Sequence, residues 1–119
     1  MLKKKMSSFN DGVCSIYEEK NTLIHTDFNA KKNAKTLNDF NLIMDSFYSI
    51  ENVREEDYEF ANNMGKLISM KIKIPFIYVV KNNHKILIDG MMYDIIKADA
   101  DRRNRELFIY LEGGISFEK

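Results

Sequence analysis

The segment 68–74 reads ISMKIKI and gives the clearest sign of the architecture, because apolar and polar residues alternate along it. Successive side chains of an extended strand point to opposite faces of a sheet. One face would therefore carry Ile68, Met70, Ile72 and Ile74. The other face would carry Lys71 and Lys73. This two-residue period predicts a β-strand that buries its apolar face against a core.

Further strands are expected on the C-terminal side of this segment. The apolar run 86–88 leads into Asp89 and Gly90, a pair suited to a two-residue hairpin because both residues tolerate positive φ. The return strand would occupy 91–96. A last strand is marked by Leu107, Ile109 and Leu111, with Phe108 and Tyr110 on its opposite side. These strands would follow one another as a meander.

The N-terminal half predicts two more strands. Segments 12–18 and 41–50 show strand-like alternation. Between them, a polar excursion at 19–40 that is rich in Asn and Lys is expected as a loop or a weakly paired ribbon. One side of the second strand would carry Leu42, Met44, Tyr48 and Ile50. Its other side would carry Ile43 and Phe47.

One helix is expected at 53–64. Asn52 would cap its free backbone N–H groups, and Asn63 with Gly65 would end it. Its first turn would hold the acidic residues Glu55, Glu56 and Asp57. The positive end of the helix dipole favours them there, so we interpret them as a helix start and not as a catalytic carboxylate group. The whole pattern predicts a mainly β (α+β) fold, a small antiparallel β-barrel or sandwich with one short helix, in a single domain spanning 1–119.

The composition limits the function classes. The 119 residues include 18 basic and 18 acidic side chains, so the formal net charge at pH 7 is zero. A dedicated nucleic-acid binder normally carries a basic excess, and zero net charge weakens solubility, which fits a protein that ends up inside an assembly. Residues 1–6 have no apolar run behind their basic cluster, and the apolar run 75–80 is too short to span a bilayer. We therefore expect a soluble, cytoplasmic protein.

Few residues suggest catalysis or metal binding. His25 and His84 share no ligand spacing with Cys14, so two surface histidines and a small buried cysteine are expected. The charged segment 99–106 lacks the glycine of a calcium loop and is expected as a solvated turn. A hydrolase or a toxin-like nuclease needs a base, an acid and oxyanion donors together, and the sequence offers no such set. We expect no enzyme, no metal and no cofactor.

Two patterns suggest contacts with other molecules. The first is the apolar run Phe76, Ile77, Tyr78, Val79 and Val80. It is either a strand buried on both faces or an apolar edge or loop that a neighbouring subunit covers. The second is the basic material at Lys31, Lys32, Lys35, Arg102, Arg103 and Arg105. This is either solvated loop surface or, if the protein lines a DNA channel, a set of phosphate contacts without sequence readout.

The order of these elements is similar to that of a known family. The pattern consists of the strand end 47–50, a helix with Glu56, Tyr58 and Ala61, then Gly65, the strand 70–74, the hairpin 86–95 and the closing strand 105–111. As an ordered set spanning 47–111, it resembles the head-closure, or head–tail joining, proteins of tailed bacteriophages and prophages. That family characteristically has a small β-barrel or sandwich with one helix.

The resemblance implies a structural protein of the virion neck. Such a protein would dock below the portal-bound adaptor, form a ring with copies of itself (dodecameric in the family) and offer a platform to tail-terminator or tail-tube proteins. Its loops would contact packaged DNA without reading its sequence, and no membrane would be involved. It would be located in the host cytoplasm during assembly and then in the virion neck.

Two alternatives remain open at this point. A tail-terminator or tail-completion protein also forms rings from a small β core. A small β-barrel that binds single-stranded nucleic acid would use aromatic rings as stacking platforms, and Tyr93, Phe108 and Tyr110 are the candidates. The zero net charge and the acidic helix count against this second alternative.

Overall fold

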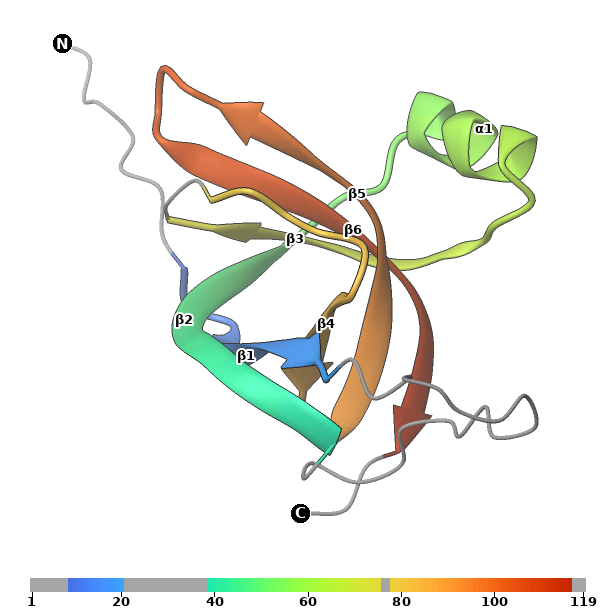
Figure 1. Ribbon diagram of the computed structural model, residues 1–119. Coiled ribbons are helices and arrows are strands. Elements are labelled where there is room, and N and C mark those ends of the chain that lie inside the picture. The colour runs from blue at the N-terminus through green and yellow to red at the C-terminus, as the bar shows by residue number, and fades with distance from the viewer. Residues whose placement is uncertain (1–8, 21–38, 76–77, 117–119) are drawn as a thin grey trace, which may run out of the picture.

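The computed structural model describes residues 9–20, 39–75 and 78–116. In these ranges the chain forms six strands and one helix (Figure 1). The strands are β1 (Gly12–Glu19), β2 (Phe40–Glu51), β3 (Ile68–Ile74), β4 (His84–Ile88), β5 (Met91–Asp101) and β6 (Glu106–Ser116). The helix α1 (Glu55–Asn63) lies between β2 and β3 in the chain. All neighbouring strands are antiparallel, and they close into a barrel in the order β1-β2-β3-β6-β5-β4. The predicted mainly β fold with one short helix is confirmed.

The barrel closes because two strands pair with distant parts of the chain. Strands β4, β5 and β6 form the predicted meander, whereas β3 pairs with β6, with Ile72 opposite Ile109. Strand β1 completes the circle against β4, with Ile16 opposite Ile86. In the predicted turn between β4 and β5, Asp89 has a φ of 49° and Gly90 a φ of 80°, as this hairpin type requires.

The interior of the barrel is filled by aliphatic side chains. The fully buried members of this inner core are Ile16, Ile72, Ile74, Ile86, Ile109, Leu111 and Cys14. Cys14 is the small buried residue that the sequence predicts, and burial raises the pKa of its thiol to about 12. A protonated, enclosed thiol is a poor nucleophile, so Cys14 acts here as a packing residue.

Irregularities in the strands change the faces of several predicted core residues. A register shift between Ile68 and Met70 turns Ile68 out of the barrel, where it contacts Ala61 of the helix. Its predicted place beside Ile72 is therefore wrong. On β2, a register shift separates Leu42 from Met44, and Leu42 is exposed. Ile50 is also 54% exposed, where β2 pairs with β3 only from Ser49 to Glu51.

The helix begins later than predicted. Arg54 is the N-cap, not Asn52, and the carboxylate of Asp57 accepts the Arg54 backbone N–H at 3.0 Å. The acidic first turn is confirmed. The helix ends at Asn63, and Gly65 follows with a φ of 73°, so the predicted stop signal is confirmed.

Residues 78–80 of the apolar run are not a strand buried on both faces, and the alternative of a loop that a neighbouring subunit covers stays a prediction. Strand β3 ends at Ile74, since Pro75 has no N–H to donate, and residues 78–80 are not in a strand. Phe76 and Ile77 lie outside the described residues. Tyr78 and Val80 contact the inner core, whereas Val79 is 76% exposed.

The two histidines have different outcomes. His84 is buried, which contradicts the predicted surface position. Its ring stacks on Tyr78 with centroids 5.7 Å apart, and its Nδ1 accepts the backbone N–H of Lys81 at 3.2 Å. His25 and most of the polar excursion at 19–40 lie outside the described residues.

Candidate functional site

The outward side chains of four neighbouring strands form two cross-strand rows. The first row runs through Glu51, Lys71, Tyr110 and Lys97 on β2, β3, β6 and β5. The second row runs through Ser49, Lys73, Phe108 and Asp99 on the same strands. Directly opposite residues lie close enough to interact. The first row therefore alternates cations with a carboxylate and an aromatic ring, and the second row places the cation Lys73 between Ser49 and Phe108. We call these eight residues the outer lattice.

Lys71 is the centre of the first row. Its ammonium lies 3.1 Å from the Asp57 carboxylate, 5.0 Å from the ring centroid of Tyr110 and 5.4 Å from that of Phe108. The side chains of Lys71 and Asp57 are only 7% and 6% exposed. The ion pair therefore joins the first turn of α1 to β3 where both side chains are largely shielded from solvent, between two aromatic rings.

The charge state of this pair follows from its surroundings. Burial alone would raise the pKa of Asp57, but hydrogen bonds from the Arg54 N–H and from Lys71 lower it, as do the positive charges of both residues. The net effect holds the pKa of this carboxyl below its usual value of 3.8. Asp57 is therefore a carboxylate at neutral pH, and it is already occupied by the cap and by Lys71.

Lys97 makes a second link between helix and barrel. Its ammonium lies 4.1 Å from the ring centroid of Phe60 and 4.7 Å from that of Tyr110. Burial raises the pKa of the Tyr110 hydroxyl, and the negative charges of Asp57 and Asp99 raise it further. The phenol therefore stays protonated and serves as a packing and hydrogen-bonding group.

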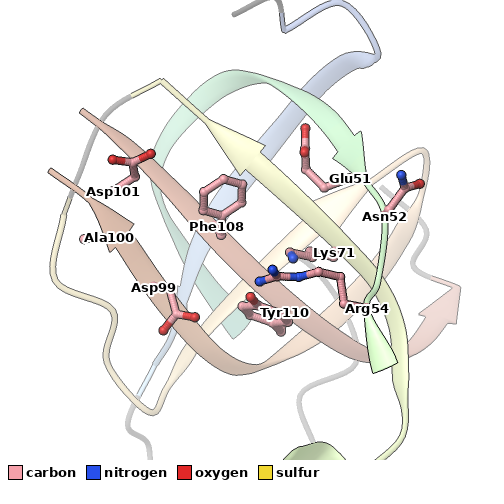
Figure 2. A pocket seen from close by; sticks show the side chains of 9 residues that line it. All are labelled: Glu51, Asn52, Arg54, Lys71, Asp99, Ala100, Asp101, Phe108 and Tyr110. Carbon is pink, nitrogen blue, oxygen red and sulfur yellow. The ribbon is translucent and has the colours of Figure 1, made fainter. Parts of the chain in front are cut away.

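A pocket of about 650 Å³ opens over this lattice (Figure 2). Asp99, Ala100 and Asp101 lie along one side of it and Glu51, Asn52 and Arg54 along the other, with Lys71, Phe108 and Tyr110 between them. Lys71, Asp99 and Glu51 each pair with a charged neighbour outside the lining. Lys97 lies 3.3 Å from Asp99, and Lys73 lies 3.6 Å from Glu51.

The lining of the pocket holds few of the side chains that act in catalysis. In the residues that line the pocket there is no Ser, Thr, Cys or His, and the lysine is held by a carboxylate. Across the described part of the chain, no three His, Cys, Asp or Glu side chains form a group that could hold a metal ion. The pocket supplies neither an activated nucleophile nor a free general base.

The structure gathers three of the predicted basic residues. Arg102, Arg103 and Arg105 are all exposed on the turn that joins β5 to β6. Asp101 shapes this turn by accepting hydrogen bonds from the backbone and side-chain N–H groups of Asn104 at 3.3 and 3.0 Å. The predicted solvated turn is confirmed for 102–105, whereas 99–101 belong to β5 and Glu106 is a buried residue of β6. A role in binding DNA stays a prediction. Lys31, Lys32 and Lys35 lie outside the described residues.

The predicted aromatic platform is poorly placed for stacking bases. Tyr110 is buried, and Tyr93 contacts the inner core. Phe108 is half-buried beside Lys71. These rings do not present three free faces in a basic groove, so the geometry gives no support to a single-stranded nucleic-acid-binding barrel.

Sequence reasoning missed the Lys71–Asp57 pair and with it the outer lattice. The alternation at 68–74 indicates which side chains share a face but not whether that face is covered. A signal was present on β6, where Phe108 and Tyr110 alternate with the core residues and give the outer face an apolar surface as well. Two aromatic residues facing away from the core predict that something covers them.

Other apolar side chains remain bare. Val13 and Phe47 are directly opposite each other on β1 and β2, and both are more than half exposed. We call these two residues the ribbon patch. A second group on and after α1 comprises Tyr58, Met64 and Leu67, which we call the helix patch.

No protein-family model matches the chain, and no curated protein is significantly similar to it. In the ranges that the structure describes, no helix has the length and apolar character needed to cross a membrane. What bears on function is therefore the surface of the barrel, its bare apolar patches and its charges.

Proposed function

We propose that this chain is a structural protein of a phage or prophage neck, which closes the head and joins it to the tail. In this role, copies of the chain form a ring below the portal-bound adaptor, and the ring provides the platform on which the tail docks. The chain acts by fitting against neighbouring proteins and not by catalysis.

The observation that carries the proposal is the contrast between a filled interior and bare apolar side chains outside. The inner core leaves its members without exposed area, yet Phe47 is 63% exposed beside its cross-strand partner Val13. Scattered exposed apolar residues are ordinary, but a paired patch on the wall of a barrel indicates a surface that another protein covers. The helix patch and Val79 add further such surface.

The ordered sequence pattern also supports it. The segments on which the family resemblance rests correspond to the end of β2, then α1, β3, the β4–β5 hairpin and β6. The three residues Glu56, Tyr58 and Ala61 all belong to α1, with Tyr58 exposed and Ala61 buried against the barrel. This arrangement agrees with a rigid barrel that presents one helix to its neighbours.

A ring is a simple way for copies of such a barrel to assemble. A ring of identical subunits requires two different surfaces on each copy, which meet in head-to-tail fashion. A barrel whose interior is complete needs no partner in order to fold, so it can assemble without large change in its backbone. The pairing of Lys71 with Asp57, of Lys97 with Asp99 and of Lys73 with Glu51 supports the same passive role.

The test is complementation of the source phage or prophage after its copy of the gene has been inactivated. We expect DNA-filled heads and free tails that do not join, seen by electron microscopy, and rescue of joined particles by the wild-type gene. Phe47→Asp should fail to rescue, whereas Phe47→Tyr, which keeps the ring, should rescue. Labelled protein should appear at the neck.

Other outcomes are equally informative. Tails of uncontrolled length in the absence of the gene would point instead to the tail-terminator alternative. Normal particles without the gene, or label located away from the neck, would overturn the proposed function.

A further inference from the structure

The turn between β5 and β6 carries a concentrated positive charge. Arg102, Arg103 and Arg105 are exposed there, and within the described residues none of them lies in an ion pair. We call these three residues the basic turn. An exposed cluster of unpaired guanidinium groups is suited to bind carboxylates or phosphates, because each can make two parallel hydrogen bonds.

Helix α1 carries a negative charge of the same size. Glu55, Glu56 and Glu59 are exposed on it, and we call them the acidic helix face. Glu56 has only a loose contact with Arg54, at 3.8 Å between two exposed groups, and no ion pair of Glu55 or Glu59 is found in the described part of the chain. The acidic helix face therefore carries three negative charges, as many as the positive charges of the basic turn.

The two surfaces do not meet within one copy. Lys97 contacts the helix through Phe60, and Arg102 lies five residues further along the extended strand β5, a distance of about 16 Å. Figure 1 shows the turn that follows β5 at the upper left of the molecule and the helix α1 at its upper right, well apart from each other. This separation exceeds the reach of an arginine side chain, so only another molecule can bring the two sets together.

We propose that the basic turn of one copy docks on the acidic helix face of the next copy, and so forms the repeated contact of the ring. This inference rests on the proposed function, which requires a ring, and it names the surfaces that join. Two different and complementary surfaces at separate places on one subunit are what a head-to-tail contact needs.

Apolar groups lie beside the charges on both surfaces. The helix patch adjoins the acidic helix face in sequence, and Leu67 follows the helix. On the other side, β3 ends opposite the start of β6, with Ile74 paired to Leu107, so the connection that contains the exposed Val79 leaves the barrel at the end where the basic turn lies. An apolar centre with a charged rim is the usual anatomy of a protein interface.

The same arginines could meet DNA phosphates, but their surroundings favour the carboxylates of another subunit over phosphates. Asp99 and Asp101 precede the basic turn, and Glu106 follows it. These flanking carboxylates lower the net positive charge of the turn, which weakens its attraction for the continuous row of charges on a phosphate backbone. A helix face offers separate carboxylates that can reach individual arginines.

The contact can be tested by exchanging charges between the two surfaces. The turn variant is Arg102→Glu with Arg103→Glu, and the helix variant is Glu56→Arg with Glu59→Arg. These choices leave Arg105, whose φ is 57°, and the helix residue Glu55 unchanged. Thermal unfolding of each variant should match that of the wild type, which shows that the fold is retained.

Self-association is measured by analytical ultracentrifugation at low salt, over a range of protein concentrations. We expect each variant alone to associate at least about tenfold more weakly than the wild type, because like charges then face each other. The variant that carries all four changes should associate as the wild type does, since its contact has merely exchanged signs. An equimolar mixture of the turn and helix variants should also associate, with alternating copies.

The results distinguish this inference from the proposed function. Association that is unaffected by either single-surface variant, or a four-change variant that fails to recover it, would overturn the assigned contact, as would a chain that stays monomeric at every concentration. Loss of binding to double-stranded DNA by the turn variant with unchanged self-association would assign the basic turn to DNA instead. A third result is that the four-change variant recovers association while the gene proves dispensable for the neck. That pair of results would support the contact between copies and reject the neck role.

Discussion

The inward face of β3 carries Ile72 and Ile74, which have no exposed area, whereas its outward face carries Lys71 and Lys73. Both faces are covered, but by different means. The closed barrel itself covers the inward face with aliphatic side chains from the other strands. The outward face is covered by the first turn of α1, by aromatic rings and by carboxylates.

The two faces of β3 differ in whether directional interactions stabilise them. Aliphatic burial has no preferred direction, so the inward face depends on volume and contact. The outward face depends on particular partners, because a buried ammonium is costly unless a carboxylate or an aromatic face meets it. Substitutions on the two faces should therefore fail in different ways.

The largest effect is expected inside the barrel. Ile72→Ala should lower the free energy of unfolding by about 3 kcal/mol, because it leaves a cavity in a closed core. The matched control is Ile50→Ala on the adjacent strand, directly opposite Ile72 but 54% exposed, with an expected loss below about 1 kcal/mol. Urea unfolding measures both values. Equal losses would mean that the two positions do not differ in burial as described.

A smaller but partner-dependent effect is expected outside. Asp57→Asn should cost about 2 kcal/mol, because it leaves the buried Lys71 ammonium without its carboxylate while an amide oxygen can still accept the Arg54 N–H. Removing both charges, in Asp57→Asn with Lys71→Met, should cost less than the sum of the single changes. A double-mutant cycle by urea unfolding gives the coupling. Additive losses would show that the pair is not coupled.

Acid should weaken the end of the barrel that the β3–β4 connection covers. Burial lowers the pKa of His84, as does the positive charge of Lys81, against the opposing charge of Glu18. Since the folded-state pKa lies below the ordinary value of 6.5, the unfolded chain binds the proton more readily. The stability from neutral His84 is present above pH 6.5 and is lost as the pH falls through the folded-state pKa.

The variant His84→Asn isolates this titration. An asparagine oxygen can accept the Lys81 N–H in place of Nδ1 but does not titrate. Thermal unfolding as a function of pH should therefore show a flatter profile for the variant below pH 6.5, although the loss of the stacking on Tyr78 lowers its stability at every pH. Parallel profiles for the two proteins would contradict a buried neutral histidine.

The sequence predicts the strands but not what covers them. Alternation at 68–74 and the Asp89–Gly90 turn act within a few residues, so they were sufficient for β3 and for the β4–β5 hairpin. The outward turn of Ile68 depends on a register shift against β6, and the burial of Lys71 depends on Asp57, fourteen residues earlier. Both are set by contacts between separate elements, which a local period does not encode.

The same reason explains the partial prediction of the candidate site. The basic turn was found because Arg102, Arg103 and Arg105 are consecutive or nearly so in sequence. The ribbon patch was not found, because Val13 and Phe47 come from distant strands and form a pair only in the register of β1 against β2. Of the predicted apolar interface, Val79 is exposed, whereas Tyr78 and Val80 contact the core.

The smallest effect on stability is expected where the outer wall is bare. Phe47→Ser should change the free energy of unfolding by less than about 0.5 kcal/mol, since Phe47 is 63% exposed and its contact with Val13 is that of an exposed cross-strand pair. Phe108→Ser is the matched control on the covered part of the same wall, and it should cost clearly more, because Phe108 is half-buried and faces the Lys71 ammonium. Urea unfolding measures both.

If Phe47→Ser proved as costly as Phe108→Ser, the ribbon patch would be part of the fold's own stability, and its role as a surface for another protein would lose its support. If Phe47→Ser leaves the free energy of unfolding almost unchanged but fails to restore joined particles, the phenyl ring is needed for assembly and not for folding.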